Sequence, residues 1–192
     1  MVNVELAALA VRDLMAAMGV EIDDHTEGTP MRSAKAWADI LRGYTEDPAD
    51  HLDTTFSAPV DPGLIIVSGV RLQSMCAHHL LPFSGVATVA YRPSPGQRIV
   101  GISKLARVVT GYAARLQVQE NIGYQTVDAI KRRLVPSASM CIITAAHDCM
   151  RLRGVREPGA VTTTYATDGL VLDHEHAMLR DHHMAHARDF GG

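Results

Sequence analysis

The chain has 192 residues, with 18 Lys and Arg against 21 Asp and Glu, a formal charge of −3, and 47% apolar residues. This length fits one ordinary domain with a small extension, and the composition excludes a disordered chain. The slight acidity argues against a general nucleic-acid-binding protein, and no apolar run approaches the ~20 residues needed to span a bilayer. Three Cys are too few for a disulfide framework. We therefore expect a cytoplasmic protein with no nucleic-acid or membrane partner.

The first part of the chain predicts two helices. Residues 3–18 are rich in Ala, Leu and Met, with Asn3 as a cap and Gly19 as a stop. A second helix is predicted to open at Thr29-Pro30, because Pro is favoured in the first turn, and to run to Gly43. The polar, Pro-containing stretch that follows, residues 44–63, predicts an irregular connection.

The rest of the chain predicts a mixed domain. β-branched runs predict strands and Ala- and Leu-rich runs predict helices, in the order strands 64–73 and 86–92, helices 103–115 (capped by Ser103) and 117–134, strands 139–146 and 161–167, and a last helix 174–189. This β-β-α-α-β-β order favours an α+β fold over a doubly wound parallel sheet. We expect residues 1–62 to form an N-terminal helical extension and linker and residues 63–192 to form the main domain. A single sheet with helices on one face must cover its other face and its edges, so we expect oligomerisation.

The sharpest chemical signal is the segment Cys76-Ala-His-His79. Cys76 and His79 have the C-x2-H spacing that lets a thiolate and an imidazole reach one metal, and Cys149 could complete a set of three ligands. Three protein ligands leave the fourth tetrahedral position open, as in catalytic zinc sites. His78 and His147 would then be imidazoles available for proton transfer. The alternative is that the cysteines are small buried hydrophobes and the histidines lie on the surface.

Basic side chains recur in three places despite the overall acidity. Localised cations of this kind favour a small polyanionic substrate such as a nucleoside triphosphate, although each one alone could be a solvated surface charge. The sequence contains no Walker-type phosphate-binding loop. The residues are Arg32 and Lys35, then Lys104 and Arg107 beside Ser103, and finally Arg151, Arg153 and Arg156.

The pair Gln119-Glu120 is a further candidate for binding. A carboxylate can accept hydrogen bonds from both N1–H and the exocyclic amine of guanine, although a helical Glu is more often solvated. Cys141 lies inside an apolar strand, and we assign it to the core. The His-rich tail could bind a metal adventitiously, but a polar amphipathic helix is the favoured interpretation; its histidines are His174, His176, His182, His183 and His186.

Taken together, six ordered segments between residues 29 and 170 resemble the GTP cyclohydrolase I family, whose members are zinc enzymes that convert GTP to 7,8-dihydroneopterin triphosphate and formate. The segments are TPMRSAK (29–35), SMCAHHLLPF (74–83), GISKLAR (101–107), RLQVQE (115–120), HDCMRLRG (147–154) and TTT (162–164). One ordered set of six is far more specific than any single motif.

The resemblance implies roles for individual residues. Cys76, His79 and Cys149 match the zinc ligands. His78 and His147 match the histidines that shuttle protons, and Ser103 matches the serine beside the ribose. Glu120, with Gln119 beside it, matches the guanine-recognising pair. The positions that bind the triphosphate are matched by Arg32, Lys35, Lys104, Arg107 and Arg153.

The resemblance also implies an architecture. The family's tunnelling fold packs β-β-α-α-β-β subunits into rings, usually a homodecamer with sites at subunit interfaces, so residues 63–192 would be the catalytic domain with a C-terminal helix. It places the protein in pterin synthesis, with tetrahydrofolate, a pterin cofactor or a specialised metabolite as possible end products.

One residue departs from the family pattern. The family motif reads Cys-Glu-His-His, whereas this chain has Ala77 in place of the glutamate. A carboxylate there could orient the histidines, and alanine cannot. Full activity is therefore weighed against a paralogue that stops at the opened formamidopyrimidine, one that uses another purine nucleotide, and a non-catalytic nucleotide-binding oligomer. Gly123 is a weaker departure, because glycine loosens a helix that the family keeps regular.

Overall fold

The computed structural model describes residues 2–188. The chain divides into two compact units between Glu46 and Asp47. The second unit therefore includes residues 47–62, which the sequence alone groups with the N-terminal extension, because Ala49 and Leu52 there are completely buried in its core. Within residues 2–188, no helix is both long and apolar enough to cross a membrane.

The first unit is a pair of packed helices, α1 (Val4–Ala17) and α2 (Thr29–Ile40), followed by the short 3-10 helix η1 (Arg42–Tyr44). The predicted start and stop of α1 are confirmed. Asn3 Oδ1 accepts a hydrogen bond from the backbone N–H of Leu6 at 2.9 Å, and Gly19 adopts a φ of +74° just after the helix end.

The second unit is built on one five-stranded sheet in the order β5-β2-β3-β6-β7. The strands β2 and β5 run parallel, and all other neighbours are antiparallel. A small two-stranded sheet joins β1 to β4. The elements are η2 (Pro48–Asp53), β1 (Thr55–Phe56), β2 (Ile65–Cys76), β3 (Pro82–Arg92), β4 (Ile99–Val100), α3 (Ile102–Ala113), β5 (Leu116–Gln117), α4 (Gln119–Leu134), β6 (Ala138–His147), α5 (Asp148–Arg151), β7 (Thr162–Gly169) and α6 (Asp173–Ala187). The expected α+β class and β-β-α-α-β-β order are confirmed.

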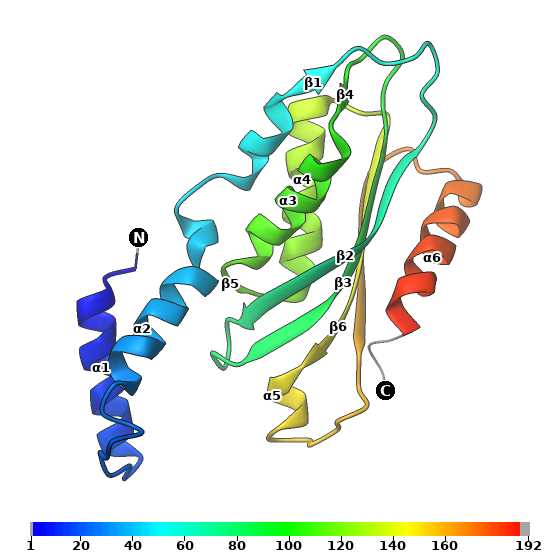
Figure 1. Ribbon diagram of the computed structural model, residues 1–192. Coiled ribbons are helices and arrows are strands. Elements are labelled where there is room, and N and C mark those ends of the chain that lie inside the picture. The colour runs from blue at the N-terminus through cyan, green and yellow to red at the C-terminus, as the bar shows by residue number, and fades with distance from the viewer. Residues whose placement is uncertain (1, 189–192) are drawn as a thin grey trace. The chain divides into compact units, whose positions relative to one another are not determined.

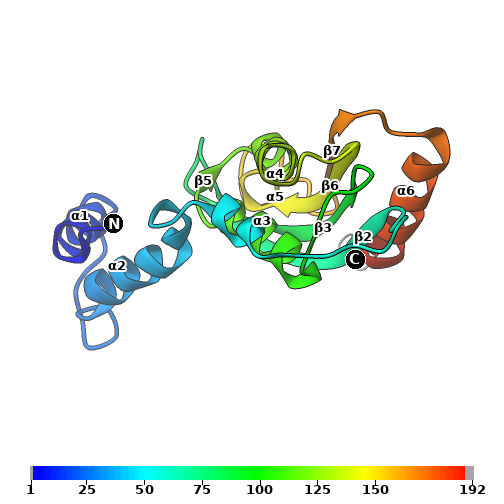
Figure 2. The ribbon, with the colours of Figure 1, turned by 90° about the horizontal axis from the view of Figure 1, so that it is seen from above.

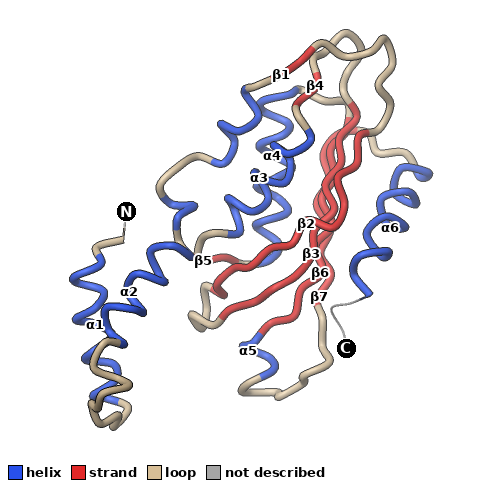
Figure 3. Tube along the Cα trace, viewed as in Figure 1, coloured by secondary structure: helices blue, strands red, loops and turns tan. Residues whose placement is uncertain are grey.

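Helices cover both faces of this sheet. Figure 1, and Figure 2 from above, show α3 and α4 on one side and α6 on the other. In Figure 3 the red strands run between these two helical layers. The two faces of the sheet carry two separate hydrophobic cores, and alternate residues of β6 point into each. Cys141, Ile143 and Ala145 pack toward α3 and α4, whereas Met140 and Ile142 pack with Leu179 of α6. The far face that we expected an oligomer to cover is thus covered in part by the chain's own last helix.

The docking of α6 uses a bulge in β2. The β2–β3 register shifts between Val67 and Val70, and Gly69 within this bulge has a φ of +72°. A Cβ at Gly69 would lie 3.1 Å from Nδ1 of His186 on α6, so the exposed His186 ring would have to shift to make room for a side chain there. The tail is the predicted polar helix with one buried face, on which Leu179 and His183 lie.

Three local predictions are corrected. The helix α3 starts at Ile102 with Gly101 as its N-cap, so Ser103 lies inside the first turn and does not cap it. The stretch 44–63 is not wholly irregular, since it contains η2 and β1. Gly123 does not interrupt α4. Its missing Cβ instead lets the helix approach β7, because a Cβ at Gly123 would lie 3.3 Å from the Cβ of Ala166.

Candidate active site

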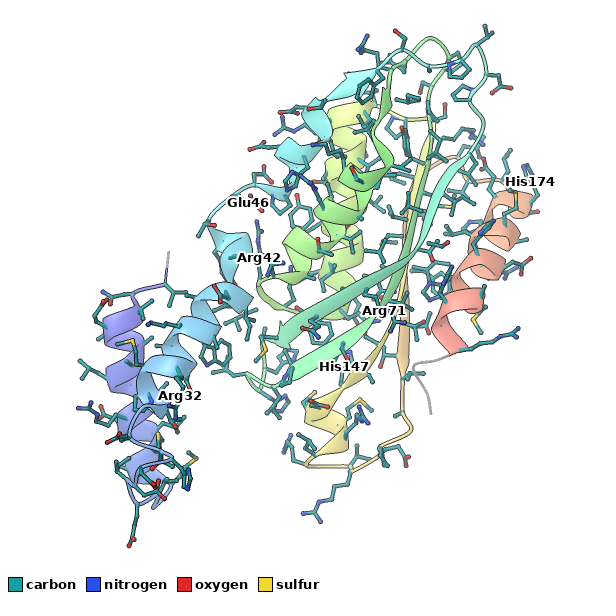
Figure 4. All side chains as sticks on the ribbon, in the orientation of Figure 1. Arg32, Arg42, Glu46, Arg71, His147 and His174 are labelled. Atoms are coloured by element: carbon teal, nitrogen blue, oxygen red, sulfur yellow. The ribbon has the colours of Figure 1, made fainter. Side chains whose placement is uncertain are left out.

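The candidate residues gather at one end of the sheet. Cys76 is the last residue of β2 and pairs with Gln117 of β5, and His147 is the last residue of β6 and pairs with Phe83 near the start of β3. The chain then continues from β5 into α4 and from β6 into α5. Three strand ends and two helix starts therefore meet at this end of the sheet, where Figure 4 labels His147 just above α5.

Three side chains form a group that could bind a metal ion, called the metal-binding group below. One donor atom each from Cys76, His79 and Cys149 lie within 4.8 Å of one another, and Cys76 Sγ is 3.8 Å from His79 Nδ1. Ligands about 2.3 Å from a tetrahedral zinc ion lie roughly 3.8 Å apart, so the spacing fits zinc without large movement. Two sulfurs and one imidazole nitrogen are also donors that zinc prefers. The three predicted ligands are thus brought together.

The β2–β3 turn presents two of these residues and His78. Within it, Cys76 donates its N–H to the carbonyl of Leu81, and Leu80 takes a left-handed φ of +53°, which is rare for a large side chain. His78 and His79 are exposed, and His78 Nδ1 lies 3.9 Å from Cys76 Sγ. The turn therefore holds one ligand in the core and projects two imidazoles beside it.

The Cys149 thiol lies in a partly buried position in α5. Burial raises its pKa, the neighbouring Cys76 adds to this, and Arg153 opposes it. A cation bound between the two sulfurs would favour their deprotonated forms. Arg153 also places Nη1 3.1 Å from His79 Nε2, so its guanidinium lies beside the metal-binding group.

The His147 ring is held on two sides. It stacks on Phe83 with ring centroids 4.4 Å apart and an angle of 12° between the planes. Its Nε2 lies 2.8 Å from Oε1 of Gln119. Burial lowers the pKa of His147, while the nearby Glu120 and Asp148 oppose that shift. The ring is therefore a half-buried imidazole with a fixed plane, close to the metal-binding group.

Gln119 and Glu120 face different surroundings although they are adjacent. The Gln119 side chain is only 2% exposed and binds protein atoms, whereas Glu120 is exposed at the first turn of α4. A groove of about 390 Å³ begins at Glu120 and runs between α4 and β7, as far as Lys131 on the helix and Asp168 on the strand. The exposed Glu120 thus lies at one end of a groove beside the edge strand β7.

The predicted cationic residues are not all brought together within the second unit. Ser103, Lys104 and Arg107 lie on the first half of α3, which starts beside β4 and ends beside β5 (Figure 1). This 12-residue helix spans about 18 Å, so Ser103 and Lys104 lie far from Cys76 in the same chain. Arg32 and Lys35 lie exposed on α2 of the first unit, where Arg32 binds the carbonyl of His25 at 2.8 Å.

Sequence reasoning missed the partners of His147. Phe83 stood within a quoted motif but carried no assigned role, and its stacking follows from the β3–β6 register. Thr162 and Thr164 hydrogen-bond the Gln119 amide across a sequence separation that no local spacing reveals. Ala77 is exposed in the turn and is bound through its backbone N–H to the Gln117 carbonyl at 2.9 Å.

Comparison with known proteins identifies the family. The family model described as GTP cyclohydrolase I matches residues 7–187. A protein of Carboxydothermus hydrogenoformans named GTP cyclohydrolase 1 is 40% identical over 194 residues, covering 98% of this chain and 100% of its own length. Proteins of the same name from Desulforamulus reducens (44%; 86% of this chain, 88% of that one) and Mycolicibacterium vanbaalenii (45%; 85% and 81%) also match.

Among solved structures, the apo form of the archaeosine synthase QueF-Like matches 60% of this chain and 99% of its own, with 17% identity and a TM-score of 0.46. That likeness is too low to add to the assignment. The sequence relatives match both units, and the family model extends from α1 to the end of α6. The chain therefore belongs to the GTP cyclohydrolase I family.

Proposed function

We propose that this protein is a zinc-dependent hydrolase that opens the imidazole ring of guanine in GTP and yields 7,8-dihydroneopterin triphosphate and formate. The single observation that carries the proposal is the group Cys76, His79 and Cys149, whose donor atoms lie within 4.8 Å of one another beside His147. Family membership supports the substrate and the reaction.

The three ligands would hold the metal through two thiolates and one imidazole. Bound there, zinc would supply a Lewis acid that lowers the pKa of a coordinated water to about 7. The three-residue set leaves one tetrahedral position for that purpose. Because Cys76 is buried at a strand end and Cys149 is fixed in α5, the chain itself sets the geometry of the site.

Two histidines would move protons. His147 would deliver a proton to the imidazole nitrogen of the purine as its ring opens, since it is a rigidly held imidazole next to the metal ligands. His78, exposed in the β2–β3 turn, would serve the later steps. Ser103 would assist at the ribose, which must open and rearrange before the new six-membered ring closes.

Glu120 would bind the guanine base of GTP, and the cationic side chains would bind its triphosphate. The exposed Glu120 would accept hydrogen bonds from N1–H and the exocyclic amine of guanine, a pattern that adenine does not offer. The cationic side chains would bind and orient the triphosphate without taking part in bond breaking. These are Arg32, Lys35, Lys104, Arg107 and Arg153.

The placement of these cations supports a site shared between subunits. Lys104 lies near the start of α3, at the end of the helix away from Cys76, and this favours a site in which a second copy of the chain supplies that cation. The sheet also ends in an open edge at β7, where a neighbouring strand could pair. We therefore propose a ring-shaped homo-oligomer, a decamer as in the family, with each site at a subunit interface.

Ala77 defines the competing candidate. The exposed position of Ala77 next to Cys76 and His78 means that a carboxylate there would stand beside the imidazoles, and this chain lacks it. Such a loss could give an enzyme that stops at the formamidopyrimidine or uses another purine nucleotide, or a protein that binds nucleotide without reaction. Retention of all three metal ligands and of Glu120 favours the full reaction.

Metal content and turnover of one matched pair of variants test the proposal. Cys149→Ala removes a ligand, and we expect it to lose stoichiometric zinc and GTP turnover together. Cys141→Ala also removes a thiol, but Cys141 is buried among core residues, where burial raises its pKa to about 12. This control should keep both zinc and turnover. A Cys149→Ala protein with normal zinc and normal turnover would contradict the metal assignment.

A further inference from the structure

The orientation of the Gln119 side-chain amide is fixed by protein atoms. Its Nε2 lies 3.0 Å from the carbonyl oxygens of Ile143 and of Thr162, and 3.1 Å from Oγ1 of Thr164. Carbonyl oxygens only accept hydrogen bonds, so the NH2 group and not the oxygen must face them. A flipped amide would set three oxygens against one another in a buried space. Oε1 must therefore point toward His147.

This orientation determines which ring nitrogen of His147 carries hydrogen. Gln119 Oε1 lies 2.8 Å from His147 Nε2, and an amide oxygen can only accept. Nε2 is therefore the donor, and in the neutral ring Nδ1 is left as the nitrogen without hydrogen. Phe83 stacks on the same ring and fixes its plane. Tautomer and plane are thus set from two different sides.

The same contacts leave the Gln119 amide poorly suited to bind a substrate. The side chain is 2% exposed, and both its oxygen and its nitrogen are engaged by protein groups. Glu120, the next residue, is exposed and lines the groove. The two residues therefore differ in function, although the sequence motif presents them as one pair.

We infer that Gln119 is a positioning residue that holds the His147 ring in the Nε2–H tautomer. The link from this tautomer to turnover rests on the proposed function, in which His147 moves protons. The tautomer itself is a property of the folded chain, and it can be measured without any substrate.

The first test is the tautomer in the zinc-loaded wild-type protein. Nitrogen-15 spectra of protein labelled at histidine would report it, with the His147 signals identified by their loss in His147→Gln. We expect hydrogen on Nε2 and none on Nδ1. Hydrogen on Nδ1 would overturn the inference, whatever the variants do.

The second test compares two buried glutamines. Gln119→Met keeps the length of the side chain but removes the acceptor, so we expect a mixed His147 tautomer and a kcat about 10–100-fold lower, with a smaller change in KM for GTP. Gln117→Met is the matched control, because the Gln117 amide binds the Tyr112 carbonyl and Gln125 instead. It should leave the His147 spectrum and kcat near wild type.

The outcomes separate this inference from the proposed function. An unchanged tautomer and kcat in Gln119→Met would overturn the positioning role, as would a raised KM with an unchanged kcat, which is the result expected of a guanine-binding side chain. If wild-type protein makes no product from GTP yet shows Nε2–H on His147, the proposed function fails and the positioning role stands. If Gln119→Met fails to fold, the wild-type spectrum still tests the tautomer, and hydrogen on Nδ1 would overturn the inference.

Discussion

Replacing His183 tests how the last helix is attached to the catalytic sheet. His183 is 1% exposed, with Nε2 2.8 Å from Thr144 Oγ1 and Nδ1 3.1 Å from Thr88 Oγ1. His183→Leu keeps an apolar side chain of moderate size but takes the imidazole partner from the completely buried Thr88 hydroxyl. A buried hydroxyl without a partner costs about 1–3 kcal/mol. Thr144 loses less, because its hydroxyl also lies 2.8 Å from Thr163 Oγ1.

The pH dependence gives the same variant a second signature. Burial lowers the pKa of His183, and His186 on the same helix adds to the shift. Below about pH 6.5 the His183 side chain becomes protonated in the unfolded chain but stays neutral in the folded chain. The free energy of unfolding therefore falls as the pH decreases through that range. Between pH 7.5 and 5.5 this one group can lower the free energy of unfolding by at most about 1.4 kcal/mol.

The assay is urea unfolding at fixed protein concentration, followed by circular dichroism at both pH values. We expect His183→Leu to be about 1–3 kcal/mol less stable than wild type at pH 7.5 and to lose less stability on acidification. The exposed neighbour gives the control, and His182→Leu should stay within about 0.5 kcal/mol of wild type. Comparing the pH dependence of His183→Leu with that of wild type isolates the contribution of His183, because the other titrating groups are the same in both proteins. Equal stability and equal pH dependence in His183→Leu and wild type would refute the reasoning.

Three further predictions concern the site. Glu120→Gln should raise KM for GTP and narrow the preference for GTP over ITP, which lacks the exocyclic amine; kinetics with both nucleotides check this, and an unchanged preference would remove the role. Lys104→Ala subunits should bind GTP weakly, and Cys149→Ala subunits should be inactive. Mixing the two should raise turnover above that of either variant alone if each site spans two chains, whereas a mixture no more active than its components would contradict a shared site. Ala77→Glu should leave zinc content unchanged and raise kcat; a lower kcat would show that this site is adapted to alanine.

The sequence predicted the regular elements well, because hydrophobic period and cap chemistry are local. The strand and helix order and the Asn3 cap needed no tertiary information. The attachment of residues 47–62 was not predictable, because it depends on how Ala49 and Leu52 meet the distant helices α3 and α4. The burial of His183 was missed for a related reason: among five tail histidines, only contact with the sheet distinguishes one.

The candidate site divides in the same way. Metal-ligand spacing pointed to Cys76 and His79, and Cys149 was a candidate third ligand that the resemblance then matched. The fold brings Cys149 close because β2 and β6 end at the same end of the sheet. Spacing could not separate Gln119 from Glu120. The two residues differ because the Gln119 amide is buried against backbone carbonyls of β6 and β7, and the sequence does not show that contact.

The most direct test of the central claim is to incubate the zinc-loaded protein with GTP and to follow formate and pterin products by mass-resolved chromatography. We predict formate together with 7,8-dihydroneopterin triphosphate, which would mean that alanine at position 77 is compatible with the whole reaction. A product that stops at the formamidopyrimidine, or no product from fully zinc-loaded protein, would contradict the proposed reaction.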